Sequence, residues 1–172
     1  GVLESCGTLI AFLDADDVWL PDKLQRQVER WRAEPEPGLV HCAAQLIDST
    51  GRMLSEVTEG VSGRVNQDLL LFRRCGVVTG GSGMLLSRRV FDEAGGFDPG
   101  LSTSADWDFF YRVGLRRSFS FIAEPLVQMR MHRANMRSNI DVMERDMLRA
   151  YEKAFRDAAP DIGGIRREAY GA

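Results

Sequence analysis

A short apolar run followed at once by acidic residues constrains the fold of this chain more than any other feature. Residues 8–13 read Thr-Leu-Ile-Ala-Phe-Leu, which predicts a fully buried strand. Asp14, Asp16 and Asp17 follow directly, and Pro21 then stands where a first helical turn tolerates proline. In open α/β sheets, ligands bind at the carboxyl ends of the strands. We therefore expect an α/β protein with a polar site directly after this strand.

Length and composition favour one domain without affinity for polyanions. The chain has 172 residues, 44% of them hydrophobic, and a net charge of −3, which provides no field to steer nucleic acid. Cys6, Cys42 and Cys75 lack the spacing of a disulfide framework or a zinc site. No apolar run near the start approaches the roughly 20 residues that cross a bilayer. We expect a cytoplasmic protein with no transmembrane segment and no nucleic-acid partner, with a domain at 1–158 and a loose tail at 159–172.

Apolar periodicity and turn residues predict the remaining elements. Leu24, Val28 and Trp31 recur at helical spacing until Pro35, and Ser104 is placed to cap a later helix. The other expected strands are 38–47, 52–55, 84–86, 118–123 and 126–131, and the other expected helices are 66–74, 88–94, 104–115 and 141–158.

The acidic cluster is the first candidate site. Carboxylates spaced one residue apart, as Asp14 and Asp16 are, can bind a hard divalent cation that also bridges two phosphates. The alternative is the start of a helix, where acidic residues favour the dipole. A helix start accounts for one or two of the acids, whereas Asp17 makes three.

Three later stretches carry the other candidate residues. Residues 80–86 read Gly-Gly-Ser-Gly-Met-Leu-Leu, whose glycines permit close backbone approach or simply form tight turns. In residues 102–112, Asp106 falls in the first turn of a helix, where it could act as a general base or only compensate the helix dipole. Residues 129–135 place His132 beside arginines, and a lone histidine is more often structural than a ligand.

The order of these motifs resembles the family 2 glycosyltransferases of bacterial cell-surface polysaccharide synthesis. The motifs read FLDADDVWLP, GGSGMLLSRRVFDEAGGFD, ADWDFFYR and RMH, and the resemblance covers residues 4–140. Their combination is far more specific than any one of them. The resemblance implies an α/β fold of the GT-A type, present in part, with a mixed sheet flanked by helices.

The resemblance also implies a role for each acidic residue. Asp14 and Asp16 match the DxD motif of the family, with Asp14 toward the nucleotide, Asp16 on a Mg²⁺ or Mn²⁺ ion, and Asp17 as a supporting acid. Asp106 matches the position of the catalytic carboxylate. The usual pair at that position is Glu-Asp, and Ala105 replaces its first member here, which leaves the base itself in place.

The remaining motifs supply the other implied contacts. His132 matches a position that contacts the metal or the diphosphate, and Arg130 would help to hold the leaving group. Gly81 and Gly83 would let the sugar or the acceptor approach the backbone. The implied reaction is inverting transfer from a nucleotide-diphosphate sugar to a hydroxyl of a carbohydrate or lipid-linked acceptor. Such an enzyme would be cytoplasmic and could be peripheral to the inner face of the membrane.

The amino end departs from the family pattern. Members begin with a strand-helix-strand half that binds the nucleotide base, and roughly its first 80 to 90 residues are missing here. The sheet would then have an unpaired edge, so either the chain comes from a longer protein or it pairs with a partner or another copy as a homo-oligomer.

Two other functions remain open. Asp14 to Val18 also fits the DxDx(T/V) nucleophile motif of haloacid-dehalogenase-type phosphatases. That superfamily needs a lysine followed by a later acidic pair, but Lys153 lies after every candidate pair and Lys23 lies just after the motif. The third interpretation is a noncatalytic remnant or interaction module that keeps the fold and has lost turnover.

Overall fold

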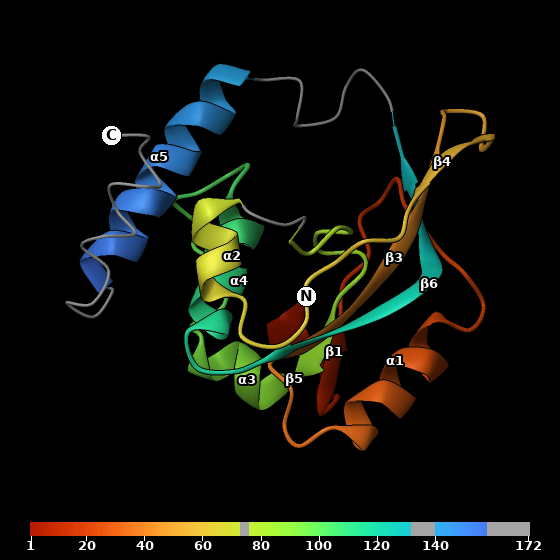
Figure 1. The fold of residues 1–172 in the computed structure, drawn as a ribbon, viewed down its shortest axis with the longest axis horizontal. Coiled ribbons are helices and arrows are strands. Elements are labelled where there is room, and N and C mark those ends of the chain that lie inside the picture. Colours follow the sequence, from red (N-terminus) through yellow and green to blue (C-terminus); the bar gives the residue numbers. More distant parts are fainter. Residues whose placement is uncertain (73–75, 132–139, 158–172) are drawn as a thin grey trace.

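A mixed six-stranded sheet forms the centre of the computed structural model, which describes residues 1–72, 76–131 and 140–157 (Figure 1). The strands are β1 (Leu9–Ala11), β2 (Val18–Trp19), β3 (Leu39–Ile47), β4 (Met53–Val57), β5 (Leu85–Ser87) and β6 (Phe119–Arg130). Their spatial order is β1-β5-β3-β6-β2, and β4 pairs with β3. Only β3 and β6 pair in parallel among these strands. The predicted α/β fold with a mixed sheet is confirmed.

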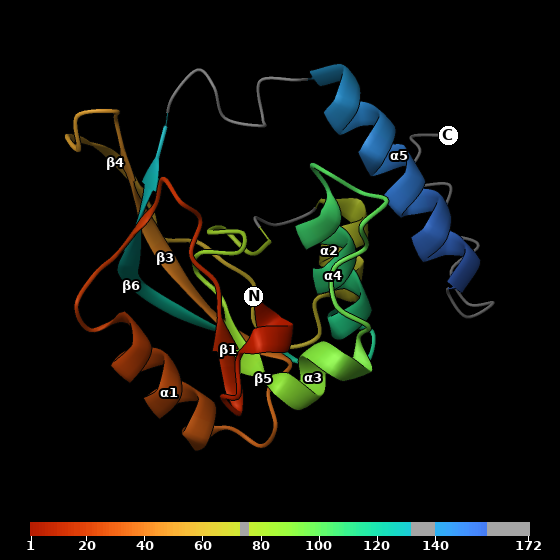
Figure 2. The ribbon, with the colours of Figure 1, turned by 180° about the vertical axis from the view of Figure 1, so that it is seen from behind.

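Helices cover both faces of this sheet. They are a short 3-10 turn at Val2–Glu4, α1 (Lys23–Ala33), α2 (Asn66–Leu71), α3 (Arg88–Glu93), α4 (Ala105–Gly114) and α5 (Ile140–Asp157). Figure 2 shows α1 on one side of the sheet and the other four helices on the opposite side. The helix α5 forms an outer layer, because it packs on α4. None of the helices in the described part of the chain is long and apolar enough to span a bilayer.

Two apolar clusters hold the helices α2 to α5 to the sheet and to one another. The larger one lies between the sheet and the helices α2, α3 and α4, and it includes Ile10, Leu39, Leu69, Met84, Leu86, Val90, Phe109, Phe110, Val113 and Phe119. The second joins α4 to α5 through Trp107, Tyr111, Ala150, Tyr151 and Ala154, with Leu70 and Leu101 beside them. The aromatic side chains of α4 therefore pack in two directions, Phe109 and Phe110 toward the sheet and Trp107 and Tyr111 toward α5.

The helix α1 buries polar side chains where apolar ones were expected. Lys23 and Gln27 are 1% and 0% exposed, whereas Leu24 is 42% exposed. Gln27 Nε2 donates to the carbonyl oxygens of Val40, at 3.1 Å, and Gly83, at 2.6 Å, and its Oε1 accepts from Lys23 Nζ at 2.7 Å. The predicted helix is confirmed, but Leu24, one of the apolar residues at helical spacing, is exposed. Buried carbonyl groups need donors, and α1 provides them.

Two strand predictions are also corrected. The run 8–13 is not a fully buried strand, because β1 has three residues and only Ile10 is buried. Within the described residues, β1 is an edge strand of the sheet. The second correction concerns 118–131, which forms one strand instead of two. β6 continues through Pro125, where its pairing with β3 shifts register beside Ala43, and a proline is tolerated at such an irregularity.

The predicted ends of two helices differ from the structure or lie outside it. The helix expected at 66–74 ends at Leu71, and Phe72 adopts a left-handed conformation with φ 46°. The helix expected at 141–158 is confirmed as α5. The predicted tail at 159–172 lies outside the described residues.

Candidate functional site

The acidic cluster lies in the loop that joins β1 to β2. The backbone N–H of Asp17 donates to the carbonyl oxygen of Asp14 at 3.2 Å, which closes the loop as a tight turn. Burial of the carboxyl group raises the pKa of Asp14, and repulsion from Asp17 and from Asp16 raises it further, while a hydrogen bond with Ser82 lowers it. The turn therefore concentrates negative charge that a cation would neutralise.

Ser82 attaches this loop to the glycine-rich segment. Its Oγ accepts from the backbone N–H of Asp14 at 3.0 Å, and its carbonyl oxygen accepts from the indole N–H of Trp19 at 2.8 Å. Ser82 is 0% exposed, so both bonds are shielded from water. The next residue must be glycine, because a Cβ at Gly83 would lie 1.4 Å from Oγ1 of Thr79. The start and the end of the acidic loop are thus held by one buried residue.

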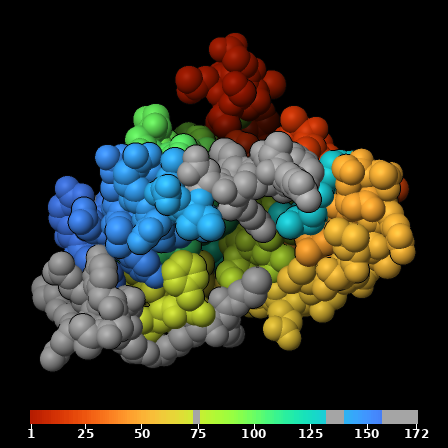
Figure 3. Space-filling view, turned by 90° about the horizontal axis from the view of Figure 1, so that it is seen from above, coloured from red at the N-terminus to blue at the C-terminus, as the bar shows by residue number. Residues whose placement is uncertain are grey.

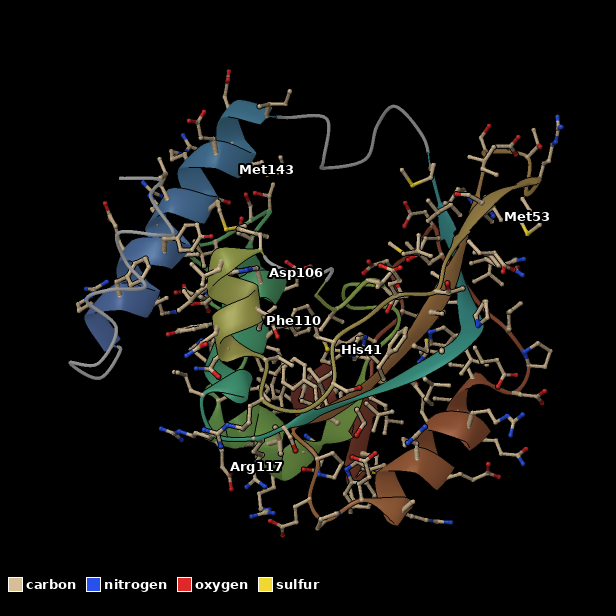
Figure 4. The ribbon with its side chains drawn as sticks, in the orientation of Figure 1. His41, Met53, Asp106, Phe110, Arg117 and Met143 are labelled. Atoms are coloured by element: carbon tan, nitrogen blue, oxygen red, sulfur yellow. The ribbon has the colours of Figure 1, made fainter. Side chains whose placement is uncertain are left out.

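Two consecutive glycines lie between the acidic loop and α4. A Cβ built on Gly80 would lie 3.3 Å from Oδ2 of Asp106, and a Cβ built on Gly81 would lie 3.8 Å from Oδ1 of Asp14. Gly80 also has φ +49°, a conformation that favours glycine. The structure thus brings together Asp14, Gly81 and Asp106, which the sequence assigned to one site. Figure 4 shows Asp106 at the upper end of α4, level with the glycine turn.

Asp106 lies in the first turn of α4, as predicted, and is half-buried. Its Oδ1 accepts from the backbone N–H of Trp107 at 2.7 Å. Ser104 occupies the N-cap position, as predicted, but its side chain makes no capping hydrogen bond, so the predicted capping role of this side chain is wrong. The Oγ atom of Ser104 is buried without a hydrogen-bond partner among the described residues.

A pocket of about 170 Å³ opens beside Asp106. Its lining consists of Asp68, Leu69, Phe72, Gly76, Val77, Asp106, Trp107 and Phe110. Two carboxylates and three aromatic rings therefore surround a space large enough for part of a sugar ring. Figure 3, seen from above, shows α5 and the β3–β4 hairpin on opposite sides of this end of the molecule.

Arg130, at the end of β6, ties the acidic loop to the turn after β3. Its backbone N–H donates to Oδ1 of Asp17 at 3.0 Å, and its Nε donates to the carbonyl oxygen of Asp16 at 3.0 Å. Its Nη1 donates to the carbonyl oxygens of Asp48, at 3.0 Å, and Ser49, at 3.2 Å. Arg130 therefore lies beside the acidic loop, where the sequence placed it, and its bonds to the carbonyl oxygens of Asp16 and Asp48 are contacts that the sequence did not predict. His132, the predicted partner of the metal, lies outside the described residues.

The donors fit a cation that leaves most of its coordination positions to substrate and water. Among the described residues, no three histidine, cysteine, aspartate or glutamate side chains converge as a complete metal site. Magnesium commonly binds through one or two carboxylates and substrate phosphates. Asp14 and Asp16 provide such oxygen ligands, so the chemistry of the donor set agrees with a shared metal and diphosphate site.

The two lysines do not support the phosphatase interpretation. Lys23 Nζ donates to Gln27 and lies 4.2 Å from the centre of the Trp19 ring, beneath the acidic loop. Lys153 Nζ lies 2.7 Å from Oδ2 of Asp98 and 3.1 Å from Oδ1 of Asp108. Both lysines are thus engaged in packing α1 or α5.

Sequence reasoning missed Ser82, Trp19 and Asp68 as parts of the site. Ser82 stood within the glycine-rich motif, and its position between glycines was the available signal. Its contact with Asp14 spans 68 residues of sequence, and no local pattern predicts it. Asp68 gave no signal, because an acid in the first turn of a helix is common.

Comparison with known proteins shows the family of the chain. The profile of a family described as "Glycosyltransferase like family 2" matches residues 1–162. An uncharacterized glycosyltransferase of Nostoc sp. is 30% identical over 141 residues, which cover 78% of this chain and 43% of the relative. Another, of Rickettsia prowazekii, is 26% identical over 136 residues, with 78% and 43% covered. The chain therefore spans less than half the length of these relatives.

Proposed function

Because this chain belongs to the family 2-like glycosyltransferases, we propose that it transfers a sugar from a nucleotide-diphosphate sugar to an acceptor hydroxyl, with inversion at the anomeric carbon. The observation that supports this proposal most directly is that Asp106 and Asp14 lie beside the consecutive glycines Gly80 and Gly81. An inverting displacement needs a diphosphate site and a base on opposite sides of the reacting carbon. The glycines leave the space between them open.

The acidic loop would bind the donor. Asp14 would face the nucleotide and Asp16 would hold the metal, while Asp17 supports the loop through its bond with the backbone of Arg130. A bound Mg²⁺ or Mn²⁺ ion would neutralise charge that develops on the leaving diphosphate. The Arg130 guanidinium keeps the loop in place by binding the carbonyl oxygen of Asp16, and it would contribute positive charge near the leaving group.

Asp106 would remove the proton of the acceptor hydroxyl. Its carboxylate stands beside a pocket with Asp68 and with aromatic side chains, which suits a carbohydrate. The main chain at Gly81 would lie close to the sugar. The expected approach at Gly83 is blocked, because Thr79 fills the space beside its Cα and its carbonyl oxygen accepts from Gln27. Ala105 replaces the acidic neighbour common in the family, so the proposal assigns the proton transfer to Asp106 alone.

The wider setting of the protein is part of the same proposal. We place the chain in a GT-A fold present in part, in cell-surface polysaccharide or glycoconjugate synthesis, with a carbohydrate or lipid-linked acceptor at the cytoplasmic face of the membrane. In the described sheet β1 has one paired edge. Its other edge would accept a further strand, either from a longer form of the protein or from a second copy.

Calorimetric titration tests the donor site. We expect the chain to bind uridine or guanosine diphosphate only with Mn²⁺, and we expect Asp16→Ala to lose this binding. Asp22→Ala is the matched control, because Asp22 is exposed and makes no capping bond at the start of α1. Absence of metal-dependent binding in the unchanged chain would favour a noncatalytic remnant.

A transfer assay on the intact protein tests the base. Asp106→Asn should keep the metal-dependent diphosphate binding and lower kcat by about 10²- to 10⁴-fold, the usual contribution of a general base. Unchanged turnover in this variant would remove Asp106 from the mechanism.

A further inference from the structure

The helix α5 fixes the loop that leads into α4 through one carboxylate. Asp146 is 3% exposed, and its Oδ2 accepts from the backbone N–H groups of Ser102, at 2.8 Å, and Thr103, at 3.0 Å. The same oxygen accepts from the hydroxyl groups of Ser102, at 2.7 Å, and Thr103, at 3.3 Å. These bonds hold the pKa of Asp146 well below its usual range, and the bond from the Thr103 amide has the largest effect. The carboxylate is therefore ionised at neutral pH, and its Oδ2 atom accepts all four of these bonds.

This loop directly precedes the proposed base. Thr103 lies three residues before Asp106, and Ser104 between them provides no side-chain cap for α4. The ordinary device that fixes the first turn of a helix is therefore not used here. Asp146 takes its place from another helix, and it holds the loop at backbone donors directly ahead of that turn.

The same helix also holds α4 beyond Asp106. Lys153 Nζ lies 3.1 Å from Oδ1 of Asp108 and 2.7 Å from Oδ2 of Asp98. The hydroxyl of Tyr151 donates to the carbonyl oxygen of Leu70 at 2.8 Å, which ties α5 to α2. The helix α5 therefore contacts the chain on both sides of Asp106, at residues 102–103 before it and at Asp108 after it.

We propose that Asp146 is a positioning residue for Asp106. By holding Ser102 and Thr103, it sets the direction from which α4 begins, and so keeps Oδ2 of Asp106 on the side of Gly80. The proposal rests on the role of Asp106 proposed above. A displacement of about 1 Å of a reacting group can lower turnover about a hundredfold, so a helix outside the site can control its rate.

The variant Asp146→Asn tests this role. It preserves the shape of the side chain and replaces part of the acceptor by an amide donor, which opposes the N–H groups of the loop. In the intact protein we expect kcat to fall about ten- to a hundredfold, with KM for the nucleotide sugar unchanged within about twofold. Asp141→Asn, on the exposed first turn of α5, is the matched control and should leave both constants unchanged.

A second measurement does not depend on turnover. Nuclear magnetic resonance should show faster amide exchange at Ser102 and Thr103 in Asp146→Asn, by about tenfold, and shifted amide signals at Trp107 and Gly80, which border the Asp106 carboxylate. Faster exchange without shifts at Trp107 and Gly80 would show that Asp146 stabilises the loop only, and would overturn the proposal. Shifts at both residues in a protein that lacks transferase activity would keep the positioning role and reject the proposed function instead.

Discussion

Asp106 and Asp14 lie against consecutive glycines, Asp106 beside Gly80 and Asp14 beside Gly81. A single peptide bond therefore joins the neighbours of two carboxylates from different parts of the fold, the loop after β1 and the helix α4. A side chain at either glycine would enter the space between them.

Gly80→Ala should damage both stability and activity. The substitution places a methyl group 3.3 Å from Oδ2 of Asp106 and imposes a left-handed conformation on alanine, at a cost of about 1 kcal/mol. Gly95→Ala is the control, because Gly95 has φ +78° and nothing within 4 Å of its Cβ position. Thermal unfolding should show similar losses for the two variants. Only Gly80→Ala should lower kcat, and equal kinetics would contradict the proposed place of Gly80.

Ser82→Ala should weaken the metal-dependent binding of a nucleoside diphosphate. The variant leaves the N–H of Asp14 without its buried acceptor, which costs about 1–3 kcal/mol and loosens the acidic loop. Ser62→Ala is the control. It also removes a hydroxyl that accepts from a backbone N–H, that of Phe121 in β6, but this bond is exposed. Calorimetry should show a loss of affinity for Ser82→Ala alone. Equal affinity in both variants would mean that Ser82 does not support the binding site.

Arg130→Lys should loosen the same loop from its other side. A lysine cannot reproduce the separate bonds of the guanidinium to the carbonyl oxygens of Asp16 and Asp48, so we expect a loss of about 1–2 kcal/mol of unfolding free energy. Arg26→Lys is the control, since Arg26 makes one exposed ion pair with Glu124 at 3.4 Å. Urea unfolding measures both. A stable Arg130→Lys protein would show that the bonds to Asp16 and Asp48 are dispensable.

Stability should rise with pH between about 8 and 9 because of Lys23. Burial lowers the pKa of Lys23 from 10.5 to about 8, so the unfolded chain binds the proton more tightly than the folded one in this window. The free energy of unfolding should gain about 1 kcal/mol at most. Lys23→Met should remove this rise, which urea unfolding at several pH values can measure. An unchanged slope of unfolding free energy against pH in the variant would contradict the role of Lys23.

Cys42 should limit that rise at higher pH. Burial raises the pKa of its thiol from 9.0 to about 11, so the folded state keeps a proton that the unfolded state releases. Stability from this group is present below pH 9 and is lost as the pH rises toward 11. Cys42→Ala should therefore extend the gain from Lys23 toward pH 10.5. A plateau at pH 9 in this variant would contradict the opposing effect.

Local patterns predicted most elements of the fold, because proline, glycine and apolar spacing act within a few residues. The helix α1 and the strand β3 were found in this way. The buried face of α1 was not, since Gln27 is buried to satisfy the carbonyl oxygen of Gly83, which is 56 residues away in sequence. β6 was predicted as two strands, 118–123 and 126–131, and only the pairing with β3 shows that it continues through Pro125.

The site was predictable to a similar degree. The acidic motif and Asp106 stood out by residue type and position, and the structure brings Asp14 and Asp106 to the same glycine turn. Their supports were hidden, since Ser82 and Asp146 act on residues 68 and 44 positions away. Contacts of this range depend on how helices and strands pack, which no local spacing specifies.

The bond between Asp146 and the 102–103 loop also sets an order of events during synthesis. A nascent chain that has emerged through β6 contains every strand of the described sheet, together with Asp14 and Asp106. It still lacks the carboxylate that fixes the loop ahead of α4. The proposed base therefore cannot gain this support until α5 has also left the ribosome, later than the last strand of the described sheet.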